Sequence, residues 1–82
     1  MIENKIKDIL KNKIKDSKIF IQDMNGQNNH FSLIVISEEF EGLSIIKQHQ
    51  IIYNALSSMI TKEIHALQIK TFTWDKWKKE NQ

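Results

Sequence analysis

The spacing of apolar residues changes from a helical to a strand-like period near residue 18, and this change constrains the fold most. Five apolar residues recur at intervals that place them on one face of an amphipathic helix: Ile2, Ile6, Ile9, Leu10 and Ile14. The period then falls to two, because Ile19 and Ile21 alternate with Phe20 and Gln22. The chain therefore begins with a helix that is followed directly by a strand.

The next segment predicts a hairpin. Residues 23–29 are rich in turn-forming side chains, and Asn25-Gly26 within them is a strong signal for a tight turn between antiparallel strands. Residues 31–36 follow and are apolar at both alternating sets of positions, which predicts a strand with neighbours on each side. We therefore expect residues 31–36 to form the central strand of the sheet.

A second helix and a third strand complete the pattern. Ser44 is a suitable N-cap, and Lys62 and Glu63 are expected to end the helix. Its predicted inward face consists of Ile45, His49, Ile52, Leu56 and Met59. Residues 64–72 alternate as a strand, and Thr73 can cap a short last helix. Within that helix, Trp77 is predicted to pack over the sheet and Trp74 to lie exposed.

The order of elements is thus helix, strand, strand, helix, strand, helix. The long helix before the last strand acts as a crossover, so the second and third strands should be parallel. We predict an α+β fold with a three-stranded mixed sheet, formed by residues 1–82 as a single domain. The sequence has no cysteine, so packing must stabilise the domain without disulfides.

The charge distribution argues against a broad grip on nucleic acid. Residues 1–18 and 47–82 each contain six lysines and three acidic residues, whereas residues 19–46 contain four acidic residues and no lysine. The net charge is only +2, and arginine, the best bidentate reader of guanine, is absent. Strong binding to duplex DNA is therefore not expected.

The residue inventory also argues against catalysis and against a membrane location. No cysteine nucleophile, zinc-protease motif, glycine-rich phosphate loop or defined acid pair is present. No apolar run approaches a signal peptide or a membrane span, and no arginine-rich transit peptide is recognisable. We therefore expect a cytoplasmic protein that is not an enzyme.

Several short stretches together resemble the BolA family. They are Asn29-His30-Phe31, Phe40-Glu41-Gly42-Leu43-Ser44, His49 with Tyr53 and Leu56, Ile64-His65-Ala66-Leu67, and Thr73 with Trp77. The histidine directly before Phe31 and the short C-terminus resemble the IbaG (YrbA) branch more than BolA itself. Trp74 is a departure, because the family often has proline after the threonine that opens the last helix.

The resemblance implies a fold similar to class II KH domains and a role in binding a partner. BolA-like proteins pair with monothiol glutaredoxins, and the pair can hold a [2Fe-2S] cluster with glutathione. The resemblance assigns a ligand role to His65 and makes His30 a candidate for a second ligand. It also implies that the chain holds no cofactor when alone, as a monomer or weak dimer. Some members are described as transcriptional regulators.

Each histidine also has a structural interpretation. His65 could be a half-buried side chain hydrogen-bonded to the backbone, and His30 a solvated residue at the end of a loop. His49 falls on the apolar stripe of its predicted helix and is interpreted as structural. Because the chain has no cysteine, any cluster of the common type would need thiolates from a partner.

Two hypotheses of different classes follow. In the first, the chain is an adaptor in iron–sulfur cluster trafficking or iron sensing that pairs with a monothiol glutaredoxin. In the second, it is a DNA-binding transcriptional regulator. The only two glycines are Gly26 and Gly42, so the G-x-x-G clamp of true KH domains is absent. This absence lowers the expectation of RNA binding in the KH manner.

Overall fold

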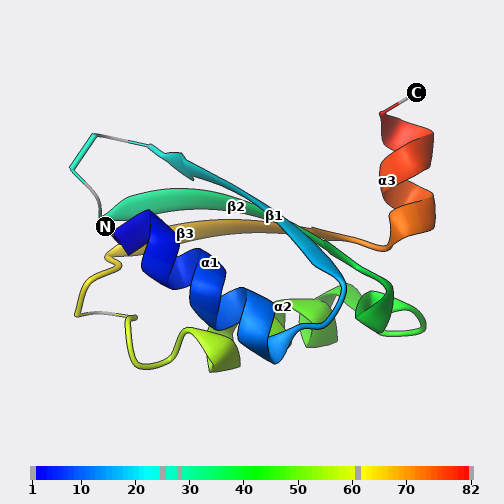
Figure 1. Ribbon diagram of the computed structural model, residues 1–82, viewed down its shortest axis with the longest axis horizontal. Coiled ribbons are helices and arrows are strands. Elements are labelled where there is room, and N and C mark those ends of the chain that lie inside the picture. The colour runs from blue at the N-terminus through cyan, green and yellow to red at the C-terminus, as the bar shows by residue number, and fades with distance from the viewer. Residues whose placement is uncertain (1, 25, 28, 61, 82) are drawn as a thin grey trace.

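The computed structural model describes residues 2–24, 26–27, 29–60 and 62–81. Its elements follow the predicted order (Figure 1). They are α1 (Ile2–Lys13), β1 (Ser17–Asp23), β2 (His30–Ser37), a 3-10 helix (Glu38–Phe40), α2 (Ile45–Ala55), β3 (Ala66–Phe72) and α3 (Trp74–Glu80). The predicted α+β class is therefore confirmed.

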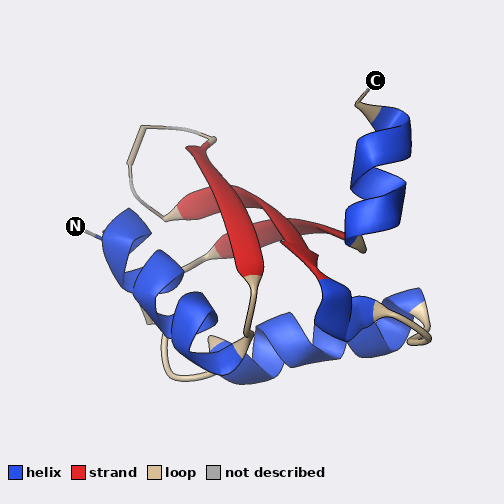
Figure 2. Cartoon of the chain, turned by 45° about the vertical axis from the view of Figure 1, so that its right-hand side comes forward, coloured by secondary structure: helices blue, strands red, loops and turns tan. Residues whose placement is uncertain are grey.

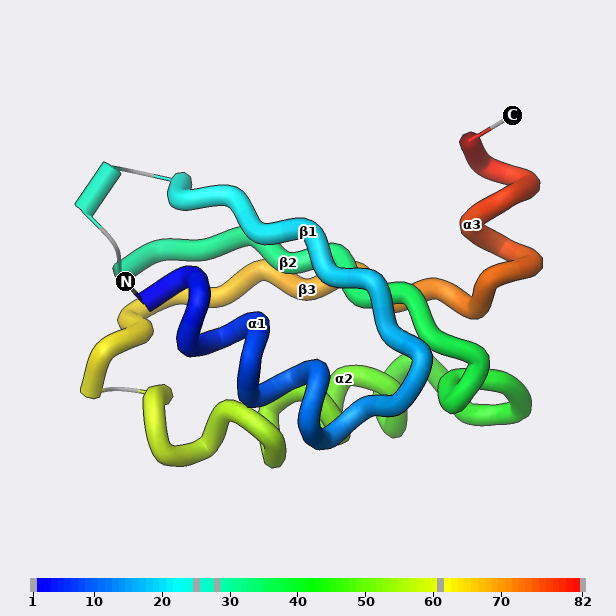
Figure 3. Tube along the Cα trace, in the orientation of Figure 1, coloured from blue at the N-terminus to red at the C-terminus, as the bar shows by residue number. Residues whose placement is uncertain are grey.

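The three strands form one sheet in the order β1-β2-β3. β1 pairs antiparallel with β2, and β3 pairs parallel with β2, so β2 is the central strand as expected. Helices α1 and α2 cover one face of this sheet, whereas α3 stands at one end on the opposite side (Figure 2). The tube view shows how α2 carries the chain back across the sheet between β2 and β3 (Figure 3).

The core lies between the sheet and the two covering helices. The predicted stripe of α1 supplies Ile6 and Leu10, with Ile14 just beyond the helix, and all three are buried. The sheet supplies alternate side chains of β2, and the remaining core side chains come from β1 and from the segments around α2: Ile19, Phe31, Leu33, Val35, Phe40, Ile52, Leu56, Met59 and Ile64. In the described part of the chain, no helix is long and apolar enough to cross a membrane.

Helix α2 is shorter than predicted. It begins after Ser44, whose side chain accepts a hydrogen bond from the Lys47 N–H, so the predicted cap is confirmed. It ends at Ala55, so the expected end at Lys62 and Glu63 is wrong. The apolar period continues beyond the helix because Leu56 and Met59 stay buried in the turns that follow. There the Met59 carbonyl accepts hydrogen bonds from three later N–H groups, which closes a tight turn.

The inward face of α2 also differs from the prediction. Ile45 is 52 % exposed and His49 is half-buried, whereas Gln48 is buried. The Gln48 amide occupies this buried position because carbonyl groups in the segment between β2 and α2 need hydrogen-bond donors there. Gln48 Nε2 donates to the carbonyl oxygens of Phe40 (3.2 Å) and Leu43 (3.0 Å). Its Oε1 accepts from the Thr71 hydroxyl at 2.6 Å, so one side chain joins α2, β3 and the preceding loop.

The last strand and helix follow the prediction with a shift. β3 begins at Ala66 and not at Ile64, because Ile64 forms an isolated bridge with Ile60 and His65 lies in a bend. Thr73 caps α3 by accepting from the Lys76 N–H, as predicted. 

Both tryptophans lie on α3. Trp77 stacks on Phe20 with ring centroids 5.5 Å apart and meets Phe72 edge-on at 5.3 Å, which confirms its packing role. Trp74 is half-buried and its Nε1–H donates to the Asp16 carbonyl at 3.4 Å, so the exposed position was a wrong prediction.

The turn between β1 and β2 can be compared with the prediction only in part. Asn25 lies outside the described residues. Gly26 has a φ of 73°, which glycine adopts without the penalty of a side chain. The Asp23 carboxylate accepts a hydrogen bond from the Gly26 N–H at 2.9 Å.

Replacing Gln48 with leucine should lower the free energy of unfolding by about 1–3 kcal/mol. The apolar side chain preserves volume but leaves the carbonyls of Phe40 and Leu43 and the Thr71 hydroxyl without this partner. Urea unfolding would measure the change. Gln50→Leu is the matched control, because Gln50 is exposed on the same helix and should shift stability by less than about 0.5 kcal/mol. Equal effects of the two variants would contradict the role of the buried amide.

Candidate functional site

The two predicted ligand histidines lie side by side. The ring centroids of His30 and His65 are 6.4 Å apart, and the rings are inclined by 49°. His30 is the first residue of β2 and is half-buried, whereas His65 is exposed in the bend that leads into β3. Residues far apart in the sequence are therefore brought together at one end of the sheet.

Backbone hydrogen bonds hold the two histidine positions. The parallel register pairs His30 with Ala66, the residue after His65. The Asn29 carbonyl accepts from the N–H of His65 at 2.7 Å and from that of Ala66 at 3.2 Å. On the other side, the Met24 N–H donates to the His30 carbonyl at 2.7 Å. The positions are thus set by the main chain, which leaves the imidazoles available for other partners.

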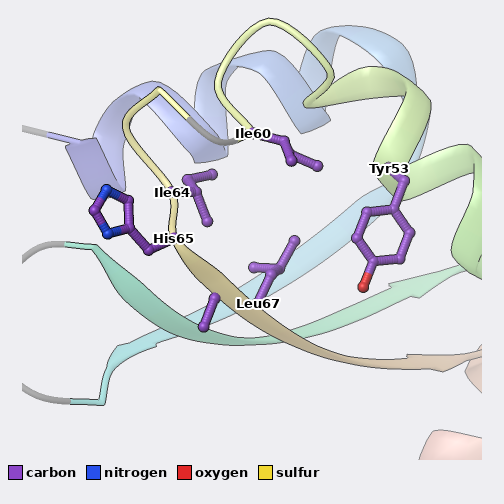
Figure 4. Close-up of a pocket in the computed structure, with 6 residues that line it drawn as sticks. Tyr53, Ile60, Ile64, His65 and Leu67 are labelled. Atoms are coloured by element: carbon purple, nitrogen blue, oxygen red, sulfur yellow. The ribbon is translucent and has the colours of Figure 1, made fainter.

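An apolar groove runs from His65 to Tyr53, between the start of β3 and the turn that follows α2. It has a volume of about 180 Å³ and is lined by Tyr53, Ile60, Ile64, His65, Ala66 and Leu67. In Figure 4, His65 lies at one end and Tyr53 at the other, with Ile60, Ile64 and Leu67 between them. Tyr53 is 43 % exposed, so the far wall of the groove presents an aromatic side chain to solvent.

The exposed apolar surface extends beyond the groove along α2. Ile46 precedes Tyr53 by two helical turns, so the two side chains share a flank of the helix. Ile46 is 71 % exposed, and Ile45 beside it is 52 % exposed. Exposed apolar side chains gathered in this way are typical of a surface that contacts another molecule.

A weak ion pair supports the turn that precedes His65. Lys5 Nζ on α1 lies 3.1 Å from Glu63 Oε1, and the two side chains are 54 % and 35 % exposed. Exposed pairs of this kind contribute little to stability because solvent screens them. The contact therefore orients the turn and does not define the site.

The donor set at this site is limited to two imidazoles. Among the described residues, no group of three or more histidine, cysteine, aspartate or glutamate side chains is arranged to hold a metal ion. The whole sequence contains no cysteine. Imidazole is a good ligand for iron, copper and zinc, but a stable site needs about four ligands. Two imidazoles could therefore supply only part of the ligand set of such a centre.

The sequence pattern did not reveal the groove. Its walls combine Tyr53 from α2 with Ile60 and Ile64 from the turn after the helix. Because the sequence predicts that this turn is helical, it does not predict that these three side chains lie together. The exposed pair Ile46 and Tyr53, seven residues apart, is the signal that could have indicated this surface. His49 lies on α2 and is half-buried, and its predicted structural role stays a prediction.

Comparisons with known proteins agree with the fold and the motifs. A family model described as BolA-like protein matches residues 2–76. An uncharacterized protein of Haemophilus influenzae is 46 % identical over 77 residues, which cover 93 % of this chain and 87 % of the other. A protein of Vibrio cholerae named DNA-binding transcriptional regulator BolA is 31 % identical over 88 residues, covering 94 % and 83 %. The higher identity to the first protein is consistent with the IbaG (YrbA) branch.

A solved structure gives the same result in three dimensions. The BolA protein homologue from Coxiella burnetii superposes with a TM-score of 0.77 at 32 % identity. The match covers 92 % of this chain and 94 % of that chain. The predicted topology and the similarity to a family of known fold therefore agree over nearly the whole length.

Replacing His65 with alanine should change the free energy of unfolding by less than about 0.5 kcal/mol, because the imidazole is exposed. Its neighbour Ile64 is 2 % exposed in the core, and Ile64→Ala should cost about 2–5 kcal/mol. Thermal or urea unfolding of both variants would test this. A large destabilisation by His65→Ala would indicate that the histidine is structural.

Proposed function

Because this chain belongs to the BolA-like protein family, we propose that it is an adaptor that pairs with a monothiol glutaredoxin. In this proposal His65 and His30 ligate a [2Fe-2S] cluster held between the two proteins. The observation that carries it is the 6.4 Å separation of the two imidazole rings at the end of the sheet. The role is in iron–sulfur cluster trafficking or iron sensing.

The composition of the site supports a shared centre. A [2Fe-2S] cluster is commonly held by four cysteines, and histidines can replace two of them on one iron. This chain supplies two histidines and no cysteine, so the remaining ligands belong to the partner, as a glutaredoxin thiolate and a glutathione thiolate. When bound, such a cluster supplies one-electron chemistry or is passed on as cargo. The chain's own part is to ligate and orient it.

The groove beside His65 supports docking of a protein on this side. A partner that covers Tyr53 and Ile60 removes apolar surface from water and brings its own ligands next to His65. Exclusion of water from the groove also protects a cluster at its end. The surface that includes Ile46 and Tyr53 enlarges the area available for contact. The proposed activity is therefore binding and not catalysis. The proposed location is the cytoplasm.

The cluster proposal is tested by visible absorption and circular dichroism. The chain is mixed with a monothiol glutaredoxin that carries its glutathione-ligated cluster. We expect the spectrum of the glutaredoxin to change when the chain is added. With His65→Ala the mixture should show the spectrum of the glutaredoxin alone. With His30→Ala the mixture should show a spectrum that differs from that of the unmodified pair. His49→Ala is the matched control, because it removes a histidine on α2 and should leave the spectrum of the mixed pair unchanged.

Three results would count against this proposal. An unchanged spectrum on mixing would refute the shared cluster, and a normal spectrum with His65→Ala would refute the ligand assignment. A loss with His49→Ala equal to that with His65→Ala would mean that the effect is not local to the paired histidines.

A second candidate function is regulation of transcription through binding to duplex DNA. It is favoured by one observation, the 31 % identity to the Vibrio cholerae protein named a DNA-binding transcriptional regulator. The net charge of +2 favours only weak, salt-sensitive binding. Electrophoretic mobility shifts at two salt concentrations would test it, and sequence-independent binding that vanishes at about 200 mM salt would contradict it.

A further inference from the structure

The face of the sheet opposite α1 and α2 is largely uncovered. Figure 1 shows both helices on one side, and only α3 on the other side, at one end of the strands. The side chains that point to this open face form rows across the three strands because the registers align them. One row is Lys18–Ile36–Phe72, the next is Phe20–Ile34–Lys70, and the third is Gln22–Ser32–Gln68.

Helix α3 packs over Ile36 and Phe72 of the first row and reaches one side of Phe20 in the second, and it leaves the rest of these rows accessible. Ile36 is fully buried and Phe72 half-buried, and Trp77 lies against Phe72. In the second row Phe20 is 41 % exposed and Lys70 is exposed, and in the third row both glutamines are exposed. A shallow cavity of about 360 Å³ lies over these rows, lined by Phe20, Ile21, Gln22, Ser32 and Ile34.

The aromatic ring in the second row is held in place. Trp77 stacks on Phe20 at 5.5 Å with an angle of 28°, so one side of the ring is supported from α3. The Lys18 ammonium group lies 5.4 Å from the centroid of the same ring. Lys18 is exposed and lies over the ring, so its flexible side chain can give way to a base that stacks on Phe20 and can contact a phosphate instead.

The charge on this face has a single sign. In the described strands, no aspartate or glutamate points to the open face, whereas Lys18 and Lys70 do. Two strand spacings separate Phe20 from Lys70, roughly 10 Å, which is within reach of adjacent nucleotides. The neighbouring α3 adds three lysines against two acidic residues: Lys76, Lys78, Lys79, Asp75 and Glu80. This balance complements a polyanion and opposes pairing with a second copy of the same face.

From this arrangement we propose that the open sheet face binds single-stranded RNA. One base stacks on Phe20, phosphates contact Lys18 and Lys70, and the third row supplies amide and hydroxyl groups to base edges and 2′-hydroxyls. Paired bases in a duplex cannot offer a free ring face to Phe20, so the geometry favours an unpaired strand. This site uses the second and third rows and not the groove beside His65, and the next row of the same face contains His30 and Ala66.

Fluorescence anisotropy of a labelled oligouridylate of about 12 nucleotides, at about 50 mM salt, would test the proposal. Phe20→Leu keeps an apolar side chain but removes the ring, and should weaken binding roughly 5- to 100-fold. Phe20→Tyr keeps the ring and should retain binding. Circular dichroism of each variant would verify that it is folded.

A matched pair of double variants tests the charge. Lys18→Gln/Lys70→Gln removes both lysines of the open face, and Lys7→Gln/Lys47→Gln removes two exposed lysines from α1 and α2. Both have the same net charge, but only the first should weaken binding and reduce its salt dependence. The proposal is overturned by no binding, by equal loss in the two double variants, or by a binding affinity for oligodeoxythymidylate or duplex DNA equal to that for the RNA.

Discussion

The parallel pairing of β2 with β3 is the constraint on which the rest of the structure depends. Parallel neighbours cannot be joined by a tight turn, so the chain must cross the sheet, and α2 provides that crossing. Helix α2 crosses on the face that α1 also covers, and the other face is left open. The same pairing places the bend at His65 beside the start of β2, where one carbonyl of Asn29 accepts from two successive N–H groups. Core, groove and histidine pair are thus consequences of one register.

Local signals in the sequence were sufficient to predict most of the fold. The caps at Ser44 and Thr73 were predicted correctly, because a cap depends only on neighbouring residues. The length of α2 was not predicted correctly. Leu56 and Met59 stay buried after the helix has ended, so the apolar period continues beyond it. Gln48 was overlooked because a buried amide is explained only by the carbonyls it meets, which are known once the fold is known.

The candidate site also has parts that the sequence indicates and parts that depend on the folded structure. His65 and His30 were singled out by resemblance to a family, since spacing alone does not distinguish a ligand from a solvated histidine. Their proximity required the strand register, which no local pattern specifies. The groove was not predicted, because it forms where Ile60 and Ile64 lie next to Tyr53. The turn that brings them together was predicted to be helical, since the apolar period of α2 continues through it. Tertiary arrangement, and not residue type, was the missing information.

The buried polar side chains have a further consequence. In the described part of the chain they are Ser37, Gln48, Thr71 and Thr73, and none of these side chains ionises in the physiological range. An amide in place of a carboxylate at Gln48 joins three segments through a contact that has no charge to gain or lose. The interior therefore keeps one protonation state when the acidity of the surroundings changes, so the hydrogen bonds that join α2, β3 and the preceding loop are the same in acidic and in neutral solution.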